Sequence, residues 1–167
     1  GEEELSGLDT TPLVGHLAAW NYFQSISAPI NSEFISTWKE FINDTDRTTN
    51  DPMEAHFIGF NLWVQAVEKA GTTDVDAVLD ALPGTETPNL TGGVARVLPN
   101  HHITKPVYIG EVRANGQFDV VWQTDGTVEG DAWSDHLPVS EDTIGDWVTR
   151  KCGNYNTKTN VCSGTAY

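Results

Sequence analysis

Residues 50–71 read NDPMEAHFIGFNLWVQAVEKAG, and this stretch says most about the fold. Asp51 is suited to cap a helix, Pro52 to occupy its first position and Glu54 to close a capping box. Gly71 suits a left-handed helix end. Apolar residues cover more than one face of the helix: Phe57, Ile58, Phe60, Leu62, Trp63, Val64, Ala66 and Val67. A surface helix keeps one face polar, so this helix predicts apolar partners on several sides, as in a layered α/β protein.

Helical and extended patterns flank this segment. Leu13–Phe23 is short, apolar and rich in aromatic residues, which predicts a buried strand and its exit loop. Asn31 is expected to cap a helix that carries apolar residues to Ile42, and Asp74–Leu82 predicts a shorter helix ended by Pro83-Gly84.

The second half of the chain has strand patterns. Gly93–Leu98 is one expected strand, and Lys105–Gln123 predicts two strands joined by a turn at residues 114–116 (Ala-Asn-Gly), because Asn-Gly tolerates positive φ. On the second arm the alternating residues are expected on one half-buried face: Phe118, Val120 and Trp122. A short helix is possible near Asp142–Val148.

Composition narrows the class of function. The chain has 167 residues, a net charge of −15 and nine Lys and Arg residues, which excludes nucleic acid as a partner because phosphate binding needs clustered cations. No run approaches the ~18 apolar residues of a membrane span. The chain starts GEEELSGLDT without Met, so we expect Gly1 to be a processed end or the start of an excerpt.

The two cysteines, Cys152 and Cys162, are expected to form a local disulfide. Closing that polar loop stabilises the fold by roughly 2.5–3 kcal/mol in the chain-entropy model. A disulfide favours an oxidising, exported location, whereas two free thiols are the alternative. Two cysteines do not make a zinc site, and we expect no metal and no cofactor. Nucleophile, phosphate-loop and dinucleotide motifs are absent from the sequence, so an enzyme is not expected.

The expected sheet is small for an α/β protein. One early strand and a late hairpin group are separated by helices, and an α/β unit with so little sheet is unusual. The chain therefore predicts an incomplete α/β fold.

Three segments carry a family resemblance, in the same order and with compatible spacing. They are GHLAAWNYFQSI (15–26), TNDPMEAHFIGFNLWVQAVEKAGTTDVDAV (49–78) and GGVARVLPNHHITKPVYIGEVRANGQFDVVWQT (92–124). Over about Glu2–Trp133 the chain resembles the C-terminal portion of urea and short-chain-amide ABC transporter substrate-binding proteins. These belong to the leucine/isoleucine/valine-receptor-like group of type I periplasmic binding proteins.

The resemblance implies a two-lobe fold that is incomplete in this chain. Such receptors have two three-layer α/β lobes, joined by three hinge crossovers, that close on a ligand in the cleft. Residues 1–43 are then expected in lobe two, 44–122 in lobe one, and 123–167 in lobe two and a C-terminal tail with the disulfide loop. The remainder of the receptor, upstream of Gly1, would cover the apolar helix.

The function that the resemblance implies is binding without bond making. The chain would belong to a periplasmic or extracellular receptor that delivers urea or a short-chain amide to the membrane permease of an ABC importer. Two alternatives stay open: a cytoplasmic amide-sensing regulator of the same fold, and a branched-chain amino-acid receptor. A disulfide argues against the cytoplasmic regulator. The ligand itself is left open between urea, formamide, acetamide and an amino acid.

The candidate ligand-binding residues follow from the chemistry of a planar, neutral ligand, which needs flat walls and a few hydrogen-bonding groups. They are Ala19, Trp20, Asn21 and Tyr22 at a strand end, and Met53 and Phe57 at a helix start. Packing inside a lobe is the alternative for the aromatic residues. Relatives often carry Tyr at the position of Phe57. Half a cleft lacks closure, so we expect the isolated chain not to bind urea tightly.

Overall fold

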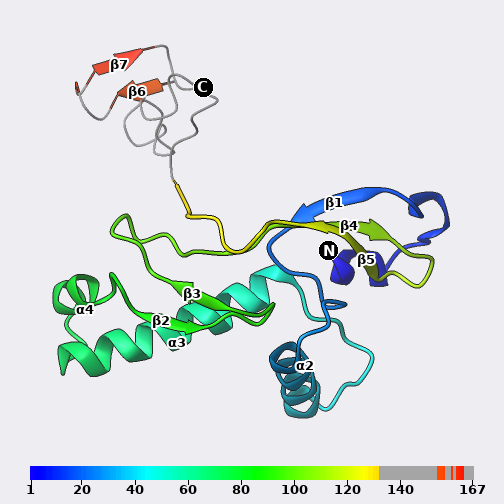
Figure 1. The fold of residues 1–167 in the computed structure, drawn as a ribbon, viewed down its shortest axis with the longest axis horizontal. Coiled ribbons are helices and arrows are strands. Elements are labelled where there is room, and N and C mark those ends of the chain that lie inside the picture. The colour runs from blue at the N-terminus through cyan, green and yellow to red at the C-terminus, as the bar shows by residue number, and fades with distance from the viewer. Residues whose placement is uncertain (132–153, 157–158, 160, 164–167) are drawn as a thin grey trace. The chain divides into compact units, whose positions relative to one another are not determined.

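The computed structural model describes residues 1–131, 154–156, 159 and 161–163 in two compact units, Gly1–Gly130 and Asp131–Tyr167 (Figure 1). Each unit is described by itself. The predicted helix near Asp142–Val148 and the cysteine Cys152 lie outside the described residues.

The first unit has three short antiparallel strands, a small hairpin and four α-helices (Figure 1). In chain order the elements are α1 (Glu2–Ser6), the 3-10 helix η1 (Thr11–Leu13), β1 (Leu17–Trp20), α2 (Pro29–Ile42), α3 (Asp51–Ala70), α4 (Val75–Ala81), β2 (Glu86–Pro88), β3 (Val94–Arg96), β4 (Tyr108–Val112) and β5 (Phe118–Gln123). Helix α4 is confirmed, with Asp74 as its N-cap.

The larger sheet has the strand order β1-β4-β5, with Leu17 opposite Glu111 and Trp20 opposite Tyr108. The buried strand expected over residues 13–23 is wrong in length and burial. Strand β1 has four residues, and Leu17 and Trp20 are 63% and 41% exposed. Because β1 pairs with β4 on one side and no described strand lies on the other, it is an edge strand.

The predicted β4–β5 hairpin is confirmed. Its turn contains Gly116 with φ of 76°, and the Gly116 N–H donates to the Arg113 carbonyl. The expected burial of alternate residues holds only for Phe118, because Val120 and Trp122 are 37% and 53% exposed. Strand β5 is the other edge strand of this sheet, and none of the described residues covers its outer half.

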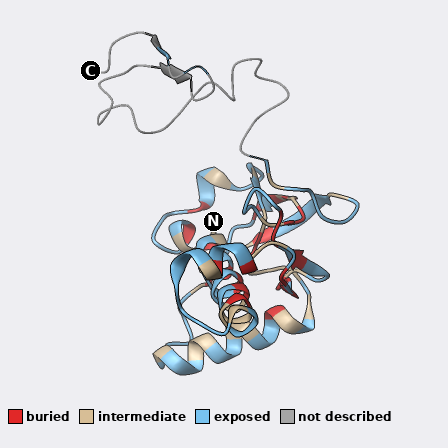
Figure 2. Ribbon diagram, turned by 90° about the vertical axis from the view of Figure 1, so that its left-hand side faces the viewer, coloured by how far each residue is buried: buried red, intermediate tan, exposed pale blue. Residues whose placement is uncertain are grey.

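Buried apolar residues form three clusters. The first lies under the sheet and comprises Leu5, Phe23, Tyr108, Val112 and Phe118. The second joins α3 to β3 through Ile58, Leu62, Ala95 and Val97, and the third joins α3 to α4 through Ala66, Val78 and Ala81. Figure 2 shows the buried residues inside the first unit and exposed turns on the outer side of the helices.

Helix α3 begins one residue earlier than predicted. Asn50 is the N-cap, with its side-chain oxygen accepting from the Met53 N–H at 3.0 Å, so Asp51 is the first helical residue. The expected capping box is also wrong, since Glu54 turns inward to Lys105. The left-handed end at Gly71, with φ of 67°, is confirmed.

One face of α3 is covered and another is open. Ile58 and Leu62 are buried, whereas Phe57, Phe60 and Trp63 are 46%, 63% and 44% exposed. The sequence predicted apolar partners on several sides. Among the described residues β3 and α4 cover the buried face, Phe34 of α2 contacts Phe57, and Phe60 and Trp63 stay exposed.

Helix α2 begins before the residue expected to cap it. Its N-cap is Ala28, and Asn31 lies in the first turn. The Asn31 side chain is buried and donates to the carbonyls of Gln24 and Ile26, at 3.1 and 2.8 Å. Asn31 therefore holds the loop after β1 to the helix.

The second unit contains one described pair of strands. β6 (Asn154–Asn156) and β7 (Val161–Ser163) are antiparallel, with Tyr155 opposite Cys162. The Cys152–Cys162 disulfide stays a prediction, because Cys152 is outside the described residues.

Candidate functional site

The end of β1 carries the first group of predicted site residues. Ala19 is exposed, Trp20 is 41% exposed, and Asn21 is half-buried. The Asn21 side-chain amide donates to the carbonyl of Pro106 at 2.8 Å, so the strand end is tied to the segment before β4. Trp20 therefore keeps part of its surface exposed at this strand end.

Tyr22 lies inside the protein. The side chain is 1% exposed, and its hydroxyl donates to Asn31 Oδ1 at 2.8 Å and lies 2.7 Å from the Thr49 hydroxyl. Burial raises the pKa of this phenol, and the nearby carboxyls of Glu2 and Glu54 act in the same direction. In this structure Tyr22 is a packing residue that joins the loop after β1 to α2 and to the start of α3.

Asp51 connects the strand end to α3. Backbone N–H groups of Asn21 and Tyr22 face its carboxylate, as does the charge of Lys105. Burial raises the pKa of Asp51, and Lys105 and the two N–H groups oppose that rise. Its Oδ1 atom has no hydrogen-bond partner among the described residues. Asp51 therefore places an unpaired acceptor beside the end of β1.

Glu54 and Lys105 form a buried ion pair, in which the Lys105 ammonium contacts Glu54 Oε2. The Glu54 side chain is fully buried and that of Lys105 is 10% exposed. Burial raises the pKa of Glu54, Lys105 lowers it, and Asp51 adds to the rise. Glu54 Oε1 has no hydrogen-bond partner in the described part of the chain. No local sequence pattern predicts this pair, because its members lie 51 residues apart along the chain.

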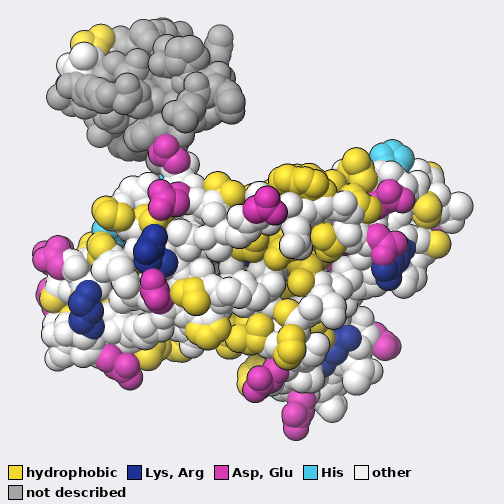
Figure 3. All heavy atoms as spheres, in the orientation of Figure 1, with side chains coloured by type: hydrophobic (Ala, Val, Ile, Leu, Met, Phe, Trp, Pro, Cys, Tyr) yellow, Lys and Arg dark blue, Asp and Glu magenta, His cyan; other side chains and the backbone are white. Residues whose placement is uncertain are grey.

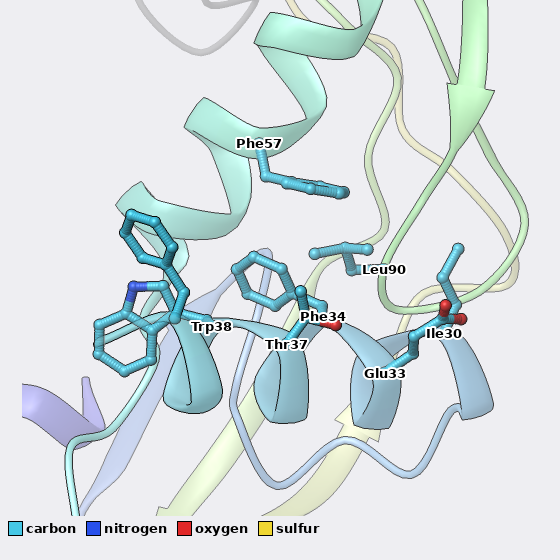
Figure 4. A pocket seen from close by; sticks show the side chains of 8 residues that line it. Ile30, Glu33, Phe34, Thr37, Trp38, Phe57 and Leu90 are labelled. Atoms are coloured by element: carbon cyan, nitrogen blue, oxygen red, sulfur yellow. The ribbon is translucent and has the colours of Figure 1, made fainter. Parts of the chain in front are cut away.

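Met53 and Phe57 face helix α2. Phe57 lies over Phe34, with ring centroids 5.1 Å apart, and Figure 4 shows Leu90 beside the two rings. The rings of Phe34 and Phe57 border an apolar groove of about 510 Å³. Its lining residues are Ile30, Glu33, Phe34, Thr37, Trp38, Phe41, Phe57 and Leu90. Met53 borders a neighbouring hollow of about 490 Å³.

The predicted site residues therefore occupy two places. Ala19, Trp20 and Asn21 lie at the strand end beside Asp51, whereas Met53 and Phe57 line hollows between α2 and α3. Sequence reasoning assigned Asp51 only a capping role and missed Lys105 and Leu90.

The surface of the first unit carries both hydrophobic and charged side chains. Figure 3 shows open hydrophobic side chains on one face among acidic groups, with few Lys and Arg. No three His, Cys, Asp or Glu side chains of the described residues come together as metal ligands. None of the described helices combines the length and hydropathy that a membrane span requires.

Comparison with known proteins identifies the fold as the type I periplasmic binding protein fold, a mixed α/β fold of which this chain matches part. Residues 1–139 match the periplasmic binding protein domain, and the chain belongs to that family.

Solved structures of solute receptors support the fold. One ABC transporter solute-binding protein from Rhodopseudomonas palustris, in complex with 3,4-dihydroxybenzoic acid, is 19% identical with a TM-score of 0.65, over 77% of this chain and 35% of the receptor. Another from that species, in complex with p-hydroxybenzoic acid, is 23% identical with a TM-score of 0.60, over 71% and 33%. An amino-acid ABC transporter substrate-binding protein from Pseudomonas fluorescens is 18% identical with a TM-score of 0.60, over 81% and 36%.

A curated relative carries a different name. A Geobacillus stearothermophilus protein named limonene hydroxylase is 29% identical over 111 residues, which is 66% of this chain and 20% of that protein. The chain thus spans about a fifth of this relative and about a third of the solved receptors.

Proposed function

We propose that this chain is part of a periplasmic or extracellular receptor that delivers urea or a short-chain amide to the permease of an ABC importer. Membership of the periplasmic binding protein family and the likeness to ABC solute receptors support the receptor class. In this proposal the protein closes on its ligand and makes no bond.

One observation carries the choice of ligand. Trp20 and Asn21 lie at the end of β1, and the backbone N–H groups of Asn21 and Tyr22 are near Asp51 in the first turn of α3, whose buried Oδ1 atom has no hydrogen-bond partner among the described residues. A flat indole suits a planar ligand, and an acceptor suits an NH2 group.

The local charge supports a neutral ligand rather than an acid. Lys105 is the main cation that acts on both Asp51 and Glu54, and it is already paired with Glu54, whereas the Gly1 amino group acts more weakly and on Asp51. A ligand carboxylate would therefore lie beside two carboxyl groups whose main cation is already paired. The Rhodopseudomonas palustris relatives bind hydroxybenzoic acids, and we propose that this receptor differs from them in ligand charge.

The lobe boundaries at residues 43 and 122 stay a prediction. The pairing of Leu17–Trp20 with Tyr108–Val112 bears on them, because the sequence assigned those strands to different lobes. We propose that the chain returns to the lobe of β1 just before Tyr108, near Lys105.

Nitrogen-15 NMR of the chain tests the ligand. Because half a cleft lacks closure, binding to this chain is expected to be weak. Urea or acetamide at high millimolar concentration should shift the Trp20 indole N–H and the Asn21 amide progressively without saturation, and leucine or 4-hydroxybenzoate should not. Trp63, which is 44% exposed against 41% for Trp20, is the internal control and should not move. Equal shifts at both indoles, or shifts caused by the acids alone, would reject the amide assignment.

A further inference from the structure

Lys105 lies where three segments of the chain meet. Its backbone pairs with Val128, through N–H to carbonyl bonds of 3.1 and 2.7 Å, which fixes the segment before β4. The side chain then runs into the interior and ends on Glu54 of α3. The next residue, Pro106, accepts the hydrogen bond from Asn21 after β1.

The Lys105 ammonium group interacts with two carboxylates of α3. Glu54 is in contact with it, and Asp51, three residues earlier on the helix, also faces its charge. Backbone N–H groups of Asn21 and Tyr22 also act on the Asp51 carboxylate. The three segments thus form a closed ring: strand end to Asp51, Asp51 and Glu54 to Lys105, and Pro106 back to Asn21.

This ring has more negative than positive charge. Asp51 Oδ1 and Glu54 Oε1 lack partners among the described residues, so Lys105 is the cation that makes burial of both carboxylates tolerable. Removing one partner of a buried ion pair leaves an uncompensated charge, which is far less favourable than removing both. Without Lys105, this uncompensated charge would favour a movement of the first turn of α3 away from the end of β1.

We propose that Lys105 is the positioning residue of the candidate site: its ammonium group holds the first turn of α3, with Asp51, against the end of β1. The inference rests on the proposed function, because it assigns Lys105 the task of keeping the Asp51 acceptor beside Trp20 and Asn21.

The test follows the Asn21 and Tyr22 amide resonances through a pH titration, which requires no ligand. Besides each other, the charged and titratable groups that act on the two carboxylates are Lys105, the Gly1 amino group, which acts on Asp51, and Tyr22, which interacts with Glu54. Lys105→Met removes the cation beside Asp51. The midpoint of the Asp51 titration, followed at the two amides, is therefore expected to rise by about one pH unit or more, which is a tenfold change in proton affinity.

Two variants make the result specific. Lys105→Arg restores a cation and should return the midpoint to the wild-type value. Lys69→Met is the matched control, because Lys69 donates to the Ala81 carbonyl at 2.9 Å, in a contact between α3 and α4. An unmoved midpoint in Lys105→Met, or an equal movement in Lys69→Met, would overturn the proposal.

A double variant covers the case in which Lys105→Met does not fold. Glu54→Gln/Lys105→Met removes the buried pair as a unit, and its reference is Glu54→Gln, from which it differs only by the loss of the cation. The midpoint at Asn21 and Tyr22 is therefore expected to be higher in the double variant than in Glu54→Gln, and equal midpoints in these two variants would overturn the proposal.

Ligand binding separates this proposal from the proposed function. Lys105→Met should weaken the acetamide response of the Trp20 indole about tenfold, with recovery in Lys105→Arg. Absence of any amide response in the wild type would reject the proposed function, while the pH titration would still decide the role of Lys105.

Discussion

The Tyr22 hydroxyl lies 2.7 Å from the hydroxyl of Thr49, the residue before the N-cap of α3. Both side chains are buried, and the Tyr22 hydroxyl also donates to Asn31 in the first turn of α2. One phenol therefore joins the exit of β1 to the starts of two helices. A residue that the sequence placed at the ligand instead organises the backbone that carries Trp20 and Asn21.

Replacing Tyr22 with Phe should destabilise the chain. The substitution leaves Asn31 Oδ1 and the Thr49 hydroxyl short of a partner in the interior, which costs about 1–3 kcal/mol. Guanidinium unfolding followed by circular dichroism measures the loss, and guanidinium is preferable because urea is a proposed ligand.

Tyr108→Phe is the control for that measurement. Tyr108 is 6% exposed, and its hydroxyl has no partner among the described residues, so the change should stay within about 0.5 kcal/mol. If both variants lose the same stability, the Tyr22 bonds are not the cause.

The buried carboxyl of Glu2 should make stability fall as pH rises. Its Oε1 accepts from the Gln24 N–H at 2.7 Å, its Oε2 lacks a partner within the described residues, and burial raises its pKa. A carboxyl whose pKa is raised in the folded state binds protons more tightly there than in the unfolded chain. Its contribution is complete below the unfolded pKa of about 4.5 and is lost as pH rises through the higher folded pKa.

Glu2→Gln should therefore be more stable than the wild type at pH 8, and the difference should vanish towards pH 4.5. Thermal unfolding across this range measures it. Glu40→Gln removes the same charge from an exposed position of α2, so it corrects for the net charge of −15. Parallel pH profiles for the two variants would show that Glu2 is not the source.

Local signals in the sequence predicted the elements well, and contacts across the chain decided what they missed. The β4–β5 turn and the Gly71 helix end are confirmed because each depends on a glycine at a positive φ, which is a local property. The cap of α3 moved to Asn50 because Asp51 is drawn to Asn21, Tyr22 and Lys105, far away in sequence. No local pattern encodes that attraction.

Burial was harder to predict than secondary structure. The sequence shows that Leu17, Trp20 and Trp122 are apolar, but their burial depends on neighbours that the described residues do not supply. For the candidate site, the strand end could be located from the sequence, whereas the Glu54–Lys105 pair could not. An ion pair between α3 and the segment before β4 follows only from the packed fold.

Gly110 should not tolerate a side chain. A Cβ atom there would lie 2.7 Å from Cζ of Phe23 and 3.0 Å from Cδ1 of Phe118, within the core under the sheet. Phe23 and Phe118 already pack with centroids 4.5 Å apart, so neither ring has room to move. Gly110→Ala is expected to cost about 1–3 kcal/mol, measured by chemical unfolding.

The matched substitution Gly59→Ala should have the opposite sign. Gly59 lies within α3 and has no atom within 4 Å of the added methyl, so higher helix propensity should stabilise the chain by about 1 kcal/mol. A loss at Gly59 or a gain at Gly110 would mean that the packing differs in solution.

The open face of α3 provides the last prediction. Ile58 is fully buried against β3, whereas Phe60, two residues on, is 63% exposed. Ile58→Ala should cost about 2–5 kcal/mol, because it leaves a cavity. Phe60→Ala should change the free energy of unfolding by about 0.5 kcal/mol or less, because no described residue buries that ring.

Sedimentation at several concentrations must accompany the unfolding curves, because an exposed apolar face can drive self-association. A large loss in Phe60→Ala together with a concentration-dependent mass would show a second copy of the chain covering the face. The same loss in a monomer would show that the chain itself covers the ring and would contradict the open face.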